Sequence, residues 1–380
     1  IIQAGHSMYE SEFPLDDSII YLNHAAVSPW PQRTANAVKQ FADENVALGS
    51  QNYLRWVATE KSLKQPLQRL VNAESSDEIA LLKNTSEALS VVAYGLPWQQ
   101  GDSVVITDQE FPSNRVVWES LQKYGVATRI ATVTGSDSPE TAIIETLDKT
   151  TQLLSVSAVQ YGTGLKLDLA VLGAACRERG ILFCVDAIQC IGAVEFDVQA
   201  SHADFVMADA HKWMMGPEGI ALFYCREAVM HRLDLKQYGW HMLEDSTNYD
   251  SHEWEVAHGA RRFECGSPNM TGVHALHASM TLIEEVGMPT IEHLVLENSR
   301  FMTDFFLQRT DSYQLVTPQP GSQHAGIVTV RPLNESAESL FETLGMKRIM
   351  CALRGGGIRF SPHFYTPRKR LFSALEALDS

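Results

Sequence analysis

Short apolar runs rich in β-branched residues recur between residues 79 and 224, and segments with helical spacing separate them. Runs of this length that are apolar throughout are typical of strands buried on both faces of a parallel sheet. We predict strands at 79–82, 104–107, 153–157, 181–185, 205–208 and 220–224. Between two of them, 169–179 has helical spacing and ends before Gly180, as helices commonly do. The alternation predicts an α/β sheet with crossover helices.

The pattern changes after about residue 260. Helices are expected at 272–286 and 291–308, and strands at 326–330 and 347–353. This order indicates a second, smaller α+β unit, and a chain of 380 residues is too long for one hydrophobic core. We therefore predict a large domain at 31–259 and a small domain made of 1–30 and 260–380.

Composition restricts the classes of partner. Hydrophobic residues make up 45% of the chain and charged residues 20%, and no apolar run reaches the ~18 residues that a membrane span requires. The formal net charge of -16 would repel a phosphate backbone, so we expect neither a nucleic acid partner nor a membrane. An anionic ligand must instead be held by a local site.

The six cysteines contain no C-x-x-C pair and stand mostly in apolar segments, which favours buried free thiols. Together with the lack of a signal-peptide pattern, this predicts a cytoplasmic protein. Among the 13 histidines, His274 and His277 have helical spacing, but no third ligand of the kind that zinc sites require stands nearby. We therefore expect no metal.

Candidate chemistry stands directly after the apolar runs, because ligands of α/β sheets bind beyond the carboxyl ends of the strands. Thr85 and Ser86 open a helical pattern after the first run, and a helix N-terminus with hydroxyls can hold a phosphate. A plain helix cap would explain them equally well, so they count only in combination. Asp186 ends the fourth run. In the simpler interpretation it is a cap, but under a pyridine cofactor it could pair with the ring nitrogen, and Gln189 with the ring oxygen.

The strongest motif is Asp209-Ala210-His211-Lys212-Trp213-Met214-Met215-Gly216-Pro217-Glu218-Gly219, directly after the expected strand 205–208. This D-x-H-K-W-x-x-G-P-x-G run resembles the lysine motif of the aminotransferase class V family, which includes cysteine desulfurases and kynureninases. The resemblance implies a fold type I α/β enzyme with a mostly parallel seven-stranded sheet, a smaller α+β domain and pyridoxal-5′-phosphate (PLP) as cofactor. It also implies that Lys212 holds PLP as a Schiff base, since a neutral lysine amine attacks the cofactor aldehyde and later moves a proton at the substrate Cα.

The resemblance extends over nearly the whole chain and assigns further roles by position. It implies that Lys212 and Asp186 are catalytic. Implied cofactor contacts are Thr85 and Ser86 at the phosphate, Phe111 stacked on the ring, Asp186, Gln189, His211 and Ser267. Implied substrate contacts are Asn23, His24, Gln160 and Arg359.

Two of these assignments rest on longer motifs. Arg359 stands in R-G-G-G-I-R-F-S-P-H-F-Y, and its planar fork can bind the substrate carboxylate through two hydrogen bonds. Ser267 stands in R-F-E-C-G-S-P-N, which resembles a family segment whose hydroxyl residue reaches the phosphate in the neighbouring subunit. The resemblance therefore implies a homodimer with shared active sites.

The chain departs from the family pattern at two positions. Asp209 stands where several cysteine desulfurases carry a phosphate-binding serine, and its charge would oppose phosphate. Those desulfurases also place a nucleophilic cysteine in a loop ahead of the carboxylate-binding arginine, whereas Cys351 here lies in an apolar run. A thiol in a strand lacks the exposure and positive surroundings that make a reactive thiolate. Arg354, before a glycine-rich turn, is expected to be a surface arginine.

These residues predict a PLP-dependent enzyme that acts on an amino acid, by transamination or by C–S or C–C lyase chemistry through a quinonoid. A cysteine desulfurase or selenocysteine lyase is the specific alternative, because elimination does not need the loop thiol. A non-catalytic binding protein of the same fold would be expected to lose the lysine, the aspartate or the arginine, and all three are present. A nicotinamide dehydrogenase is disfavoured because no G-x-G-x-x-G follows the first expected strand.

Overall fold

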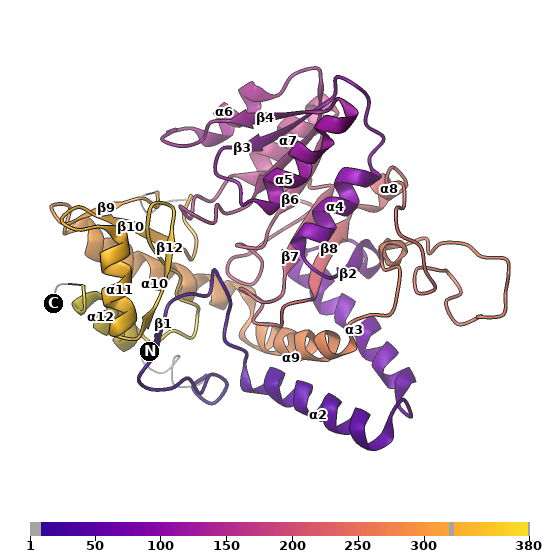
Figure 1. Ribbon diagram of the computed structural model, residues 1–380, viewed down its shortest axis with the longest axis horizontal. Coiled ribbons are helices and arrows are strands. Elements are labelled where there is room, and N and C mark those ends of the chain that lie inside the picture. Colours follow the sequence, from indigo (N-terminus) through magenta and orange to yellow (C-terminus); the bar gives the residue numbers. More distant parts are fainter. Residues whose placement is uncertain (1–8, 319–322, 379–380) are drawn as a thin grey trace.

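A seven-stranded sheet forms the centre of the computed structural model, which describes residues 9–318 and 323–378. The strands lie in the order β2-β8-β7-β6-β5-β3-β4 (Figure 1). They are β2 (Ile79–Leu82), β3 (Ser103–Thr107), β4 (Ala127–Ala131), β5 (Thr151–Ser157), β6 (Leu182–Asp186), β7 (Phe205–Asp209) and β8 (Ala221–Cys225). The predicted α/β class is confirmed, and all six predicted strands are present. Residues 1–8, which begin the predicted small-domain segment, lie outside the described residues.

The sheet is mostly parallel, as predicted, with one correction. β8 runs antiparallel to both β7 and β2, whereas the pairs from β7 to β4 are parallel. The prediction that 220–224 is a further parallel strand is therefore wrong. The connection from β7 to β8 contains no crossover helix, which a parallel return would require. The apolar pattern also missed β4, because this half-exposed edge strand has no continuous apolar run.

Helices cover both faces of the large sheet, and each face has its own core. On one side α2, α3 and α9 pack together (Figure 1). The sequence pattern did not predict α2, in which Thr34 is the one buried residue. As predicted, α7 ends at Gly180, whose φ of 68° suits glycine. The helices of this part are α2 (Gln32–Leu48), α3 (Tyr53–Val71), α4 (Thr85–Gly95), α5 (Ser113–Glu119), α6 (Pro139–Thr146), α7 (Leu169–Arg179), α8 (Glu227–Met230) and α9 (Met270–Val286).

A four-stranded antiparallel sheet in the order β12-β13-β10-β9 forms the second part. Its strands are β9 (Tyr313–Leu315), β10 (Val328–Pro332), β12 (Ala352–Arg354) and β13 (Gly357–Phe360). Beside it lie α10 (Met288–Leu307), α11 (Ala337–Met346), α12 (Arg368–Glu376) and the pair β1 (Ile20–Tyr21) with β11 (Ile349–Met350). Its separate core includes Leu22, Phe306 and Ile358. The domain boundary at residue 260 stays a prediction. α9 follows this boundary in the chain, but its Val273 and Leu276 are buried in the core of the large sheet.

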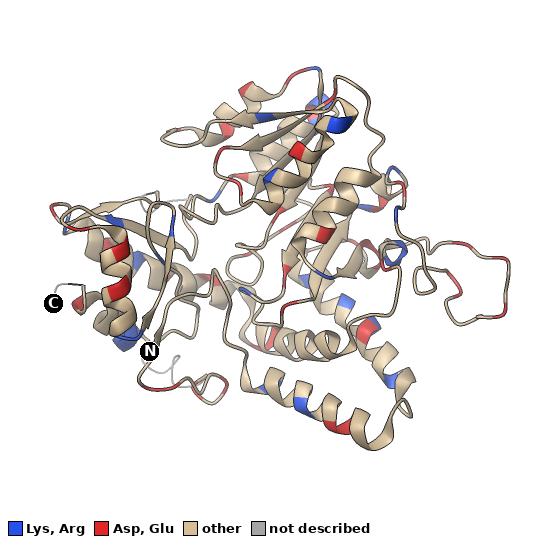
Figure 2. Cartoon of the chain, viewed as in Figure 1, with Lys and Arg blue, Asp and Glu red and all other residues tan. Residues whose placement is uncertain are grey.

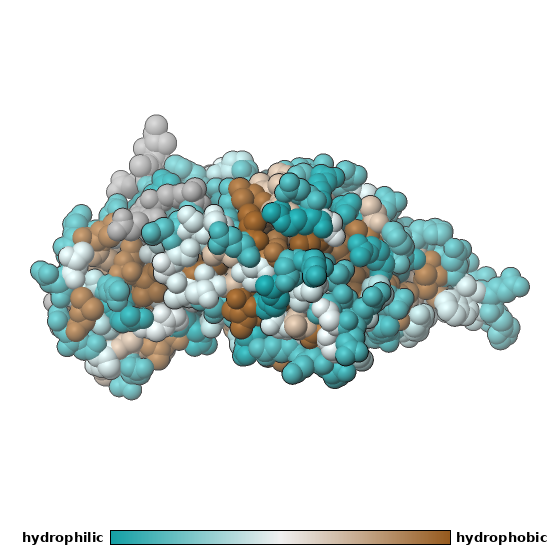
Figure 3. Space-filling model, turned by 90° about the horizontal axis from the view of Figure 1, so that it is seen from above, coloured by the Kyte–Doolittle hydropathy of each residue, from teal (hydrophilic) through white to brown (hydrophobic). Residues whose placement is uncertain are grey.

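The surface has a mixed character. Acidic and basic residues are interspersed along the elements (Figure 2), and hydrophobic residues form small separate groups among hydrophilic ones on the face shown in Figure 3. Among the described residues, no helix has both the length and the apolar character that crossing a membrane requires. The polar stretch 243–258 is irregular and projects from the body (Figure 1), where it exposes Tyr249 and Trp254.

Candidate active site

Lys212 lies in the turn after β7, at the carboxyl edge of the parallel strands. Its Nζ is 5.7 Å from the centroid of the Phe111 ring. Burial lowers the pKa of Lys212 to about 8, and the positive charge of Arg359 also lowers it, whereas Asp186 opposes this change. More of the Lys212 amine is therefore neutral at neutral pH than in an exposed lysine. The neutral amine is the form that attacks a carbonyl or accepts a proton.

Asp186 ends β6 at the same edge and is 2% exposed. Burial raises the pKa of its carboxyl to about 7, and the negative charge of Glu110 raises it further, whereas Lys212 lowers it. Its Oδ1 accepts a hydrogen bond of 3.1 Å from the backbone N–H of Ile188, so Asp186 also has the simpler role of a turn cap. No ion pair to Asp186 occurs among the described residues, and a protonated ring nitrogen would supply one.

Glu110 holds this edge together, although the sequence did not single it out. Its buried carboxylate accepts hydrogen bonds from Asn114 Nδ2 (2.8 Å), the backbone N–H of Ser157 (3.0 Å) and Gln160 Nε2 (3.1 Å). These bonds join the loop before α5 to the end of β5. Phe111 in this loop is 40% exposed and is therefore not a core residue. Gln160 is fully buried, and of its amide only Oε1 has no partner.

Thr85 is the first residue of α4 and is 4% exposed, and no described residue lies in hydrogen-bonding geometry with its Oγ1. A buried hydroxyl without a partner at a helix N-terminus is suited to an anion such as phosphate. The backbone N–H of Thr85 donates to Asp209 Oδ1 at 2.6 Å. Ser86 is exposed, and its Oγ donates to Ser113 Oγ at 2.8 Å. Ser267 is also exposed.

The two predicted substrate contacts of the N-terminal segment differ in their availability. His24 is fully buried, and its ring nitrogens lie 2.8 Å from the carbonyl oxygen of Ser361 and 2.7 Å from Tyr365 Oη. Both ring nitrogens of His24 therefore have partners among the described residues, and its predicted substrate contact remains a proposal. Asn23 has a buried Oδ1 without a partner and keeps its predicted role as a proposal.

Gln189 and His211 are the remaining predicted cofactor contacts. Gln189 Nε2 donates to the carbonyl of Ala25 at 3.0 Å, and its Oε1 accepts from Trp213 Nε1 at 2.9 Å. One hydrogen of the amide nitrogen is left over for a ligand. Burial lowers the pKa of His211 to about 4, and the charge of Lys212 adds to this. The ring is therefore neutral at neutral pH.

Arg359 lies on β13 and is 3% exposed. Its Nη1 donates to the carbonyl of Tyr161 at 2.8 Å, and its Nε is buried without a partner. Burial lowers its pKa to about 10, so the guanidinium is still charged at neutral pH. No carboxylate pairs with it among the described residues. Because an unpaired buried charge is costly, this position calls for an anionic ligand.

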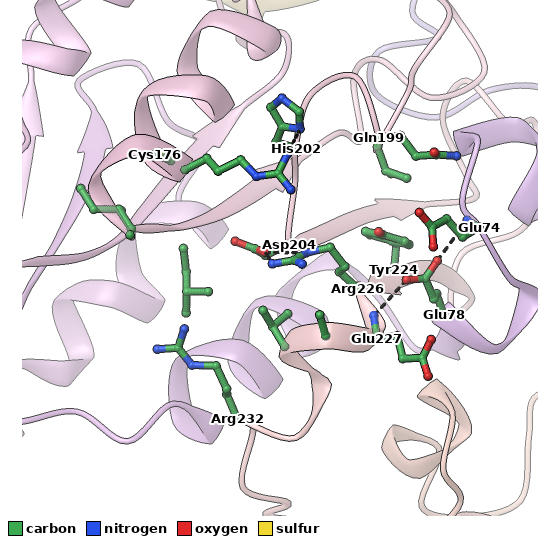
Figure 4. A pocket seen from close by; sticks show the side chains of 17 residues that line it. Glu74, Glu78, Cys176, Gln199, His202, Asp204, Tyr224, Arg226, Glu227 and Arg232 are labelled. Atoms are coloured by element: carbon green, nitrogen blue, oxygen red, sulfur yellow. Dashed lines mark hydrogen bonds and ion pairs between the residues drawn. The ribbon is translucent and has the colours of Figure 1, made fainter.

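A cavity of about 800 Å³ lies elsewhere, where β6 and β7 begin (Figure 4). It thus lies at the amino ends of these strands, whereas Lys212 lies at their carboxyl ends. Arg226 Nε donates to Asp204 Oδ1 at 2.9 Å in this cavity, and Glu78 Oε1 accepts from the backbone N–H of Glu227 at 2.9 Å. These buried carboxylates already have partners within the chain. Among the described residues, none that lines the cavity has a buried side-chain N or O atom without a partner, in contrast to Thr85, Gln160 and Arg359.

One cluster has metal-ligating atoms close together, namely Glu60, His241 and Glu264. His241 Nε2 lies 3.2 Å from Glu60 Oε1, and its Nδ1 lies 3.6 Å from Glu264 Oε2. Lys64 Nζ is 2.7 Å from Glu264 Oε1. The imidazole faces one carboxylate at each nitrogen, and the ammonium supplies a second positive charge. We interpret the cluster as a buried ion-pair network of two carboxylates with an imidazole and an ammonium.

Comparison with known proteins gives a consistent result. The model of the family described as Aminotransferase class-V matches residues 20–360. A probable cysteine desulfurase of Methanothermobacter thermautotrophicus is 29% identical, with 97% of this chain and 96% of the relative covered. The uncharacterized aminotransferase YcbU of Bacillus subtilis is 27% identical, with 97% and 96% covered.

Two solved structures share the fold. The apo cysteine desulfurase from Thermococcus onnurineus NA1 has a TM-score of 0.86 at 24% identity, covering 98% of this chain and 97% of that one. A complex of the cystine C-S lyase C-DES has a TM-score of 0.87 at 21% identity, covering 96% of this chain and 98% of that one. The chain belongs to the aminotransferase class V family. Within it, the protein is a PLP-dependent enzyme with the fold type I architecture.

The described residues fit this cofactor. Lys212 has an amine of lowered pKa, and Asp186 is a buried carboxylate without an ion-pair partner among the described residues. The orphaned hydroxyl of Thr85 suits a phosphate oxygen, and the exposed ring of Phe111 suits a planar ligand. The sequence motifs had named all four, whereas Glu110, which holds their surroundings, had no local signal.

Proposed function

We propose that the protein labilises the Cα–H bond of an amino acid, for transamination or for C–S or C–C bond cleavage. The main observation is that Arg359 is buried and has no carboxylate partner among the described residues. Arg359 also donates to the carbonyl of Tyr161, whose ring lies 5.1 Å from Phe111, the ring beside Lys212 Nζ, so Arg359 and Lys212 border the same loop. A guanidinium and an amine in one space match the carboxylate and the Cα proton of an amino acid.

Each residue then has a defined task. Lys212 holds the cofactor covalently and moves the proton at Cα, Asp186 keeps the ring nitrogen protonated, and Arg359 orients the substrate by its carboxylate. When bound, PLP supplies an electron sink for the negative charge that develops at Cα. The further proposed contacts are Thr85, Ser86, Phe111, Gln189 and His211 for the cofactor, and Asn23, His24 and Gln160 for the substrate.

Borohydride reduction followed by peptide mapping tests the cofactor assignment. The pyridoxyl group should be found on Lys212, and Lys212→Ala should abolish turnover. A label on another lysine, or steady-state turnover by the alanine variant, would contradict the proposal.

Arg359→Ala tests the substrate assignment. Loss of one partner of a desolvated charge pair typically costs ~2 to 5 kcal/mol, roughly thirtyfold to several thousandfold in amino acid affinity. Arg359→Lys should recover part of this loss. Arg370→Ala is a matched control, because Arg370 Nη2 bonds Asp17 Oδ1 at 2.7 Å on the surface. An unchanged KM in Arg359→Ala would remove Arg359 from the site.

We also propose a homodimer with shared active sites. Ser267 is exposed, which leaves its hydroxyl accessible to a second subunit, and Thr85 Oγ1 lacks a hydrogen-bond partner among the described residues. Ser267→Ala should weaken PLP binding without changing the mass measured by light scattering. A fully active monomer at working concentration would contradict the shared site. A cytoplasmic location is part of the proposal, since all six cysteines are free.

A cysteine desulfurase is the second candidate function, and the names of the similar proteins favour it. The turn between β12 and β13 consists of Gly355 and Gly356, so it has no cysteine to receive sulfur. Cys351, just before β12, is 6% exposed. Incubation with cysteine separates the candidates. Alanine together with a protein persulfide indicates a desulfurase, whereas pyruvate with free sulfide indicates elimination.

A further inference from the structure

Arg354 and Arg359 lie on the same face of one β-hairpin. In the antiparallel pair of β12 and β13, Arg354 is opposite Gly357, and Arg359 is opposite Ala352. Directly opposite residues point to the same face of a sheet, and so do residues two apart along one strand. Arg354 shares a face with Gly357, its partner across the hairpin, and Arg359 shares that face because it lies two residues further along β13. Arg354 and Arg359 are therefore diagonal neighbours on one face. Such neighbours are typically about 7–8 Å apart, a separation that two long side chains can bridge through one ligand.

The hairpin lies close to the Lys212 edge. A Cβ on Gly355, at its tip, would come within 2.3 Å of the carbonyl oxygen of Gly162, so the tip packs directly on the loop after β5. The positive charges of Arg359 and Arg354 both lower the pKa of Lys212. Arg359 Nη1 donates to the carbonyl of Tyr161 in that loop, the Tyr161 ring lies 5.1 Å from the Phe111 ring, and that ring lies 5.7 Å from Lys212 Nζ. The hairpin therefore borders the space that Lys212 faces.

Arg354 makes one hydrogen bond, to the carbonyl of its own neighbour, whereas a third arginine of this sheet bonds two other segments. Arg354 is exposed, and Nη1 donates to the carbonyl of Leu353 at 2.8 Å. No carboxylate pairs with it among the residues that the structure describes. Arg331, by contrast, donates from Nε to the carbonyl of Gly356 at 3.1 Å and from Nη1 to Gln314 Oε1 at 3.2 Å. Arg331 thus holds the sheet together, and Arg354 is available to a ligand.

Two guanidinium groups exceed what one α-carboxylate needs, because a single guanidinium binds a carboxylate through two parallel hydrogen bonds. The cofactor phosphate does not account for the second one, since the proposed phosphate contacts lie at the N-terminus of α4. We propose that Arg354 binds a second anionic group of the substrate, so that the enzyme prefers amino acids with a carboxylate or an equivalent anion beyond the α-carbon. This inference rests on the proposed function and names its substrate class.

Binding of unreactive carboxylates to the holoenzyme, measured by calorimetry, tests the pair without turnover. Wild type should bind succinate or glutarate at least tenfold more tightly than propionate. Arg354→Ala should remove most of this difference and leave the affinity for propionate unchanged. Arg354→Lys should keep part of it, and Arg359→Ala should weaken all three ligands. Arg370→Ala, which removes an equal charge on the surface of α12, should change nothing.

Two results would overturn the inference. One is equal affinity of wild type for propionate and the dicarboxylates. The other is an equal loss for all ligands in Arg354→Ala, because Arg354 would then act on the α-carboxylate.

Turnover assays show which kind of amino acid supplies the second anion. They also distinguish a failure of this inference from a failure of the proposed function. Aspartate and glutamate carry it on the side chain, and cystine carries it on a second amino acid unit. Preference for any of these over alanine supports the inference, and loss of that preference in Arg354→Ala completes it. If amino acids react without such a preference, only the inference fails. If none reacts and borohydride labels no Lys212, the proposed function itself fails.

Discussion

The backbone N–H of Thr85 donates a hydrogen bond of 2.6 Å to Asp209, which ties the start of α4 to the end of β7. Asp209 stands where several desulfurases carry a phosphate-binding serine. Its carboxylate here accepts the hydrogen bond from the backbone of Thr85. Burial raises the pKa of Asp209 to about 6, whereas the bond from Thr85 lowers it. At neutral pH the carboxylate is mostly ionised beside the hydroxyl proposed to contact phosphate.

Asp209→Asn should therefore strengthen phosphate binding. The amide oxygen can still accept from Thr85, and the repulsive charge is gone. An interaction of about 1 kcal/mol through partly buried protein corresponds to about fivefold in affinity. Calorimetry of the apoprotein with inorganic phosphate measures it. Asp209→Ala, which also loses the acceptor, should not show this gain. Weaker phosphate binding by the asparagine variant would mean that the charge is not what limits the site.

Covalent attachment of PLP to the apoprotein should depend on pH through Lys212. Its pKa of about 8 means that the neutral amine increases as pH rises from 6 to 8 and changes little above 9. The attachment rate, followed by absorbance, should rise with that fraction. Asp186→Asn removes a charge that raises the pKa of Lys212, so the midpoint should move to lower pH. A midpoint near the ordinary lysine value of about 10.4 would contradict the buried setting.

Asp186→Asn should keep much of the cofactor but slow exchange of the substrate Cα hydrogen for deuterium, by about a hundredfold or more. A neutral amide no longer favours the protonated ring nitrogen that accepts the charge. Asp204→Asn is the control, because Asp204 is also buried but lies at the opposite edge, paired with Arg226. An exchange rate equal to that of wild type would show that Asp186 only caps the turn, through its hydrogen bond from Ile188.

Cys351→Ser should leave turnover within about twofold and lower the free energy of unfolding by ~1 to 3 kcal/mol, since it buries a hydroxyl in an apolar core. Burial raises the pKa of the Cys351 thiol to about 12, so little thiolate exists at neutral pH. Cys265→Ser, at a half-buried position, should cost less stability. Complete loss of activity in a folded, PLP-loaded Cys351→Ser variant would make Cys351 a nucleophile and the protein a desulfurase.

His241 should stabilise the fold in a pH-dependent manner. Burial alone would lower its pKa, but the hydrogen bond and charge of Glu60 and the charge of Glu264 outweigh this, so the pKa is raised. Its stabilisation is therefore fully present below the unfolded value of about 6.5 and is lost as pH rises through the folded value. The difference in unfolding free energy between wild type and His241→Asn should shrink from pH 6 to pH 9. A difference that stays constant or grows from pH 6 to pH 9 would contradict this role of His241.

Much of the large sheet was predictable because its information is local. A strand buried on both faces must be apolar throughout, so β3, β5, β6 and β7 are visible as short apolar runs. The lysine motif directly after β7 also placed Lys212 at the sheet edge. β4 and α2 were missed, because an exposed strand edge and a helix with one buried residue leave no such pattern.

The sequence by itself determined the fold class, and it named Lys212, Asp186 and Arg359 as the residues for which a role is proposed. Only the tertiary structure decided which groups have partners. Among the residues that the structure describes, both ring nitrogens of His24 have partners, in Ser361 and Tyr365, whereas Thr85 Oγ1 and Arg359 Nε have none. The physical reason is that hydrogen bonding and burial arise between segments far apart in the chain, where periodicity carries no information. Whether a polar side chain serves the fold or faces a ligand therefore depends on packing, and the local sequence does not encode it.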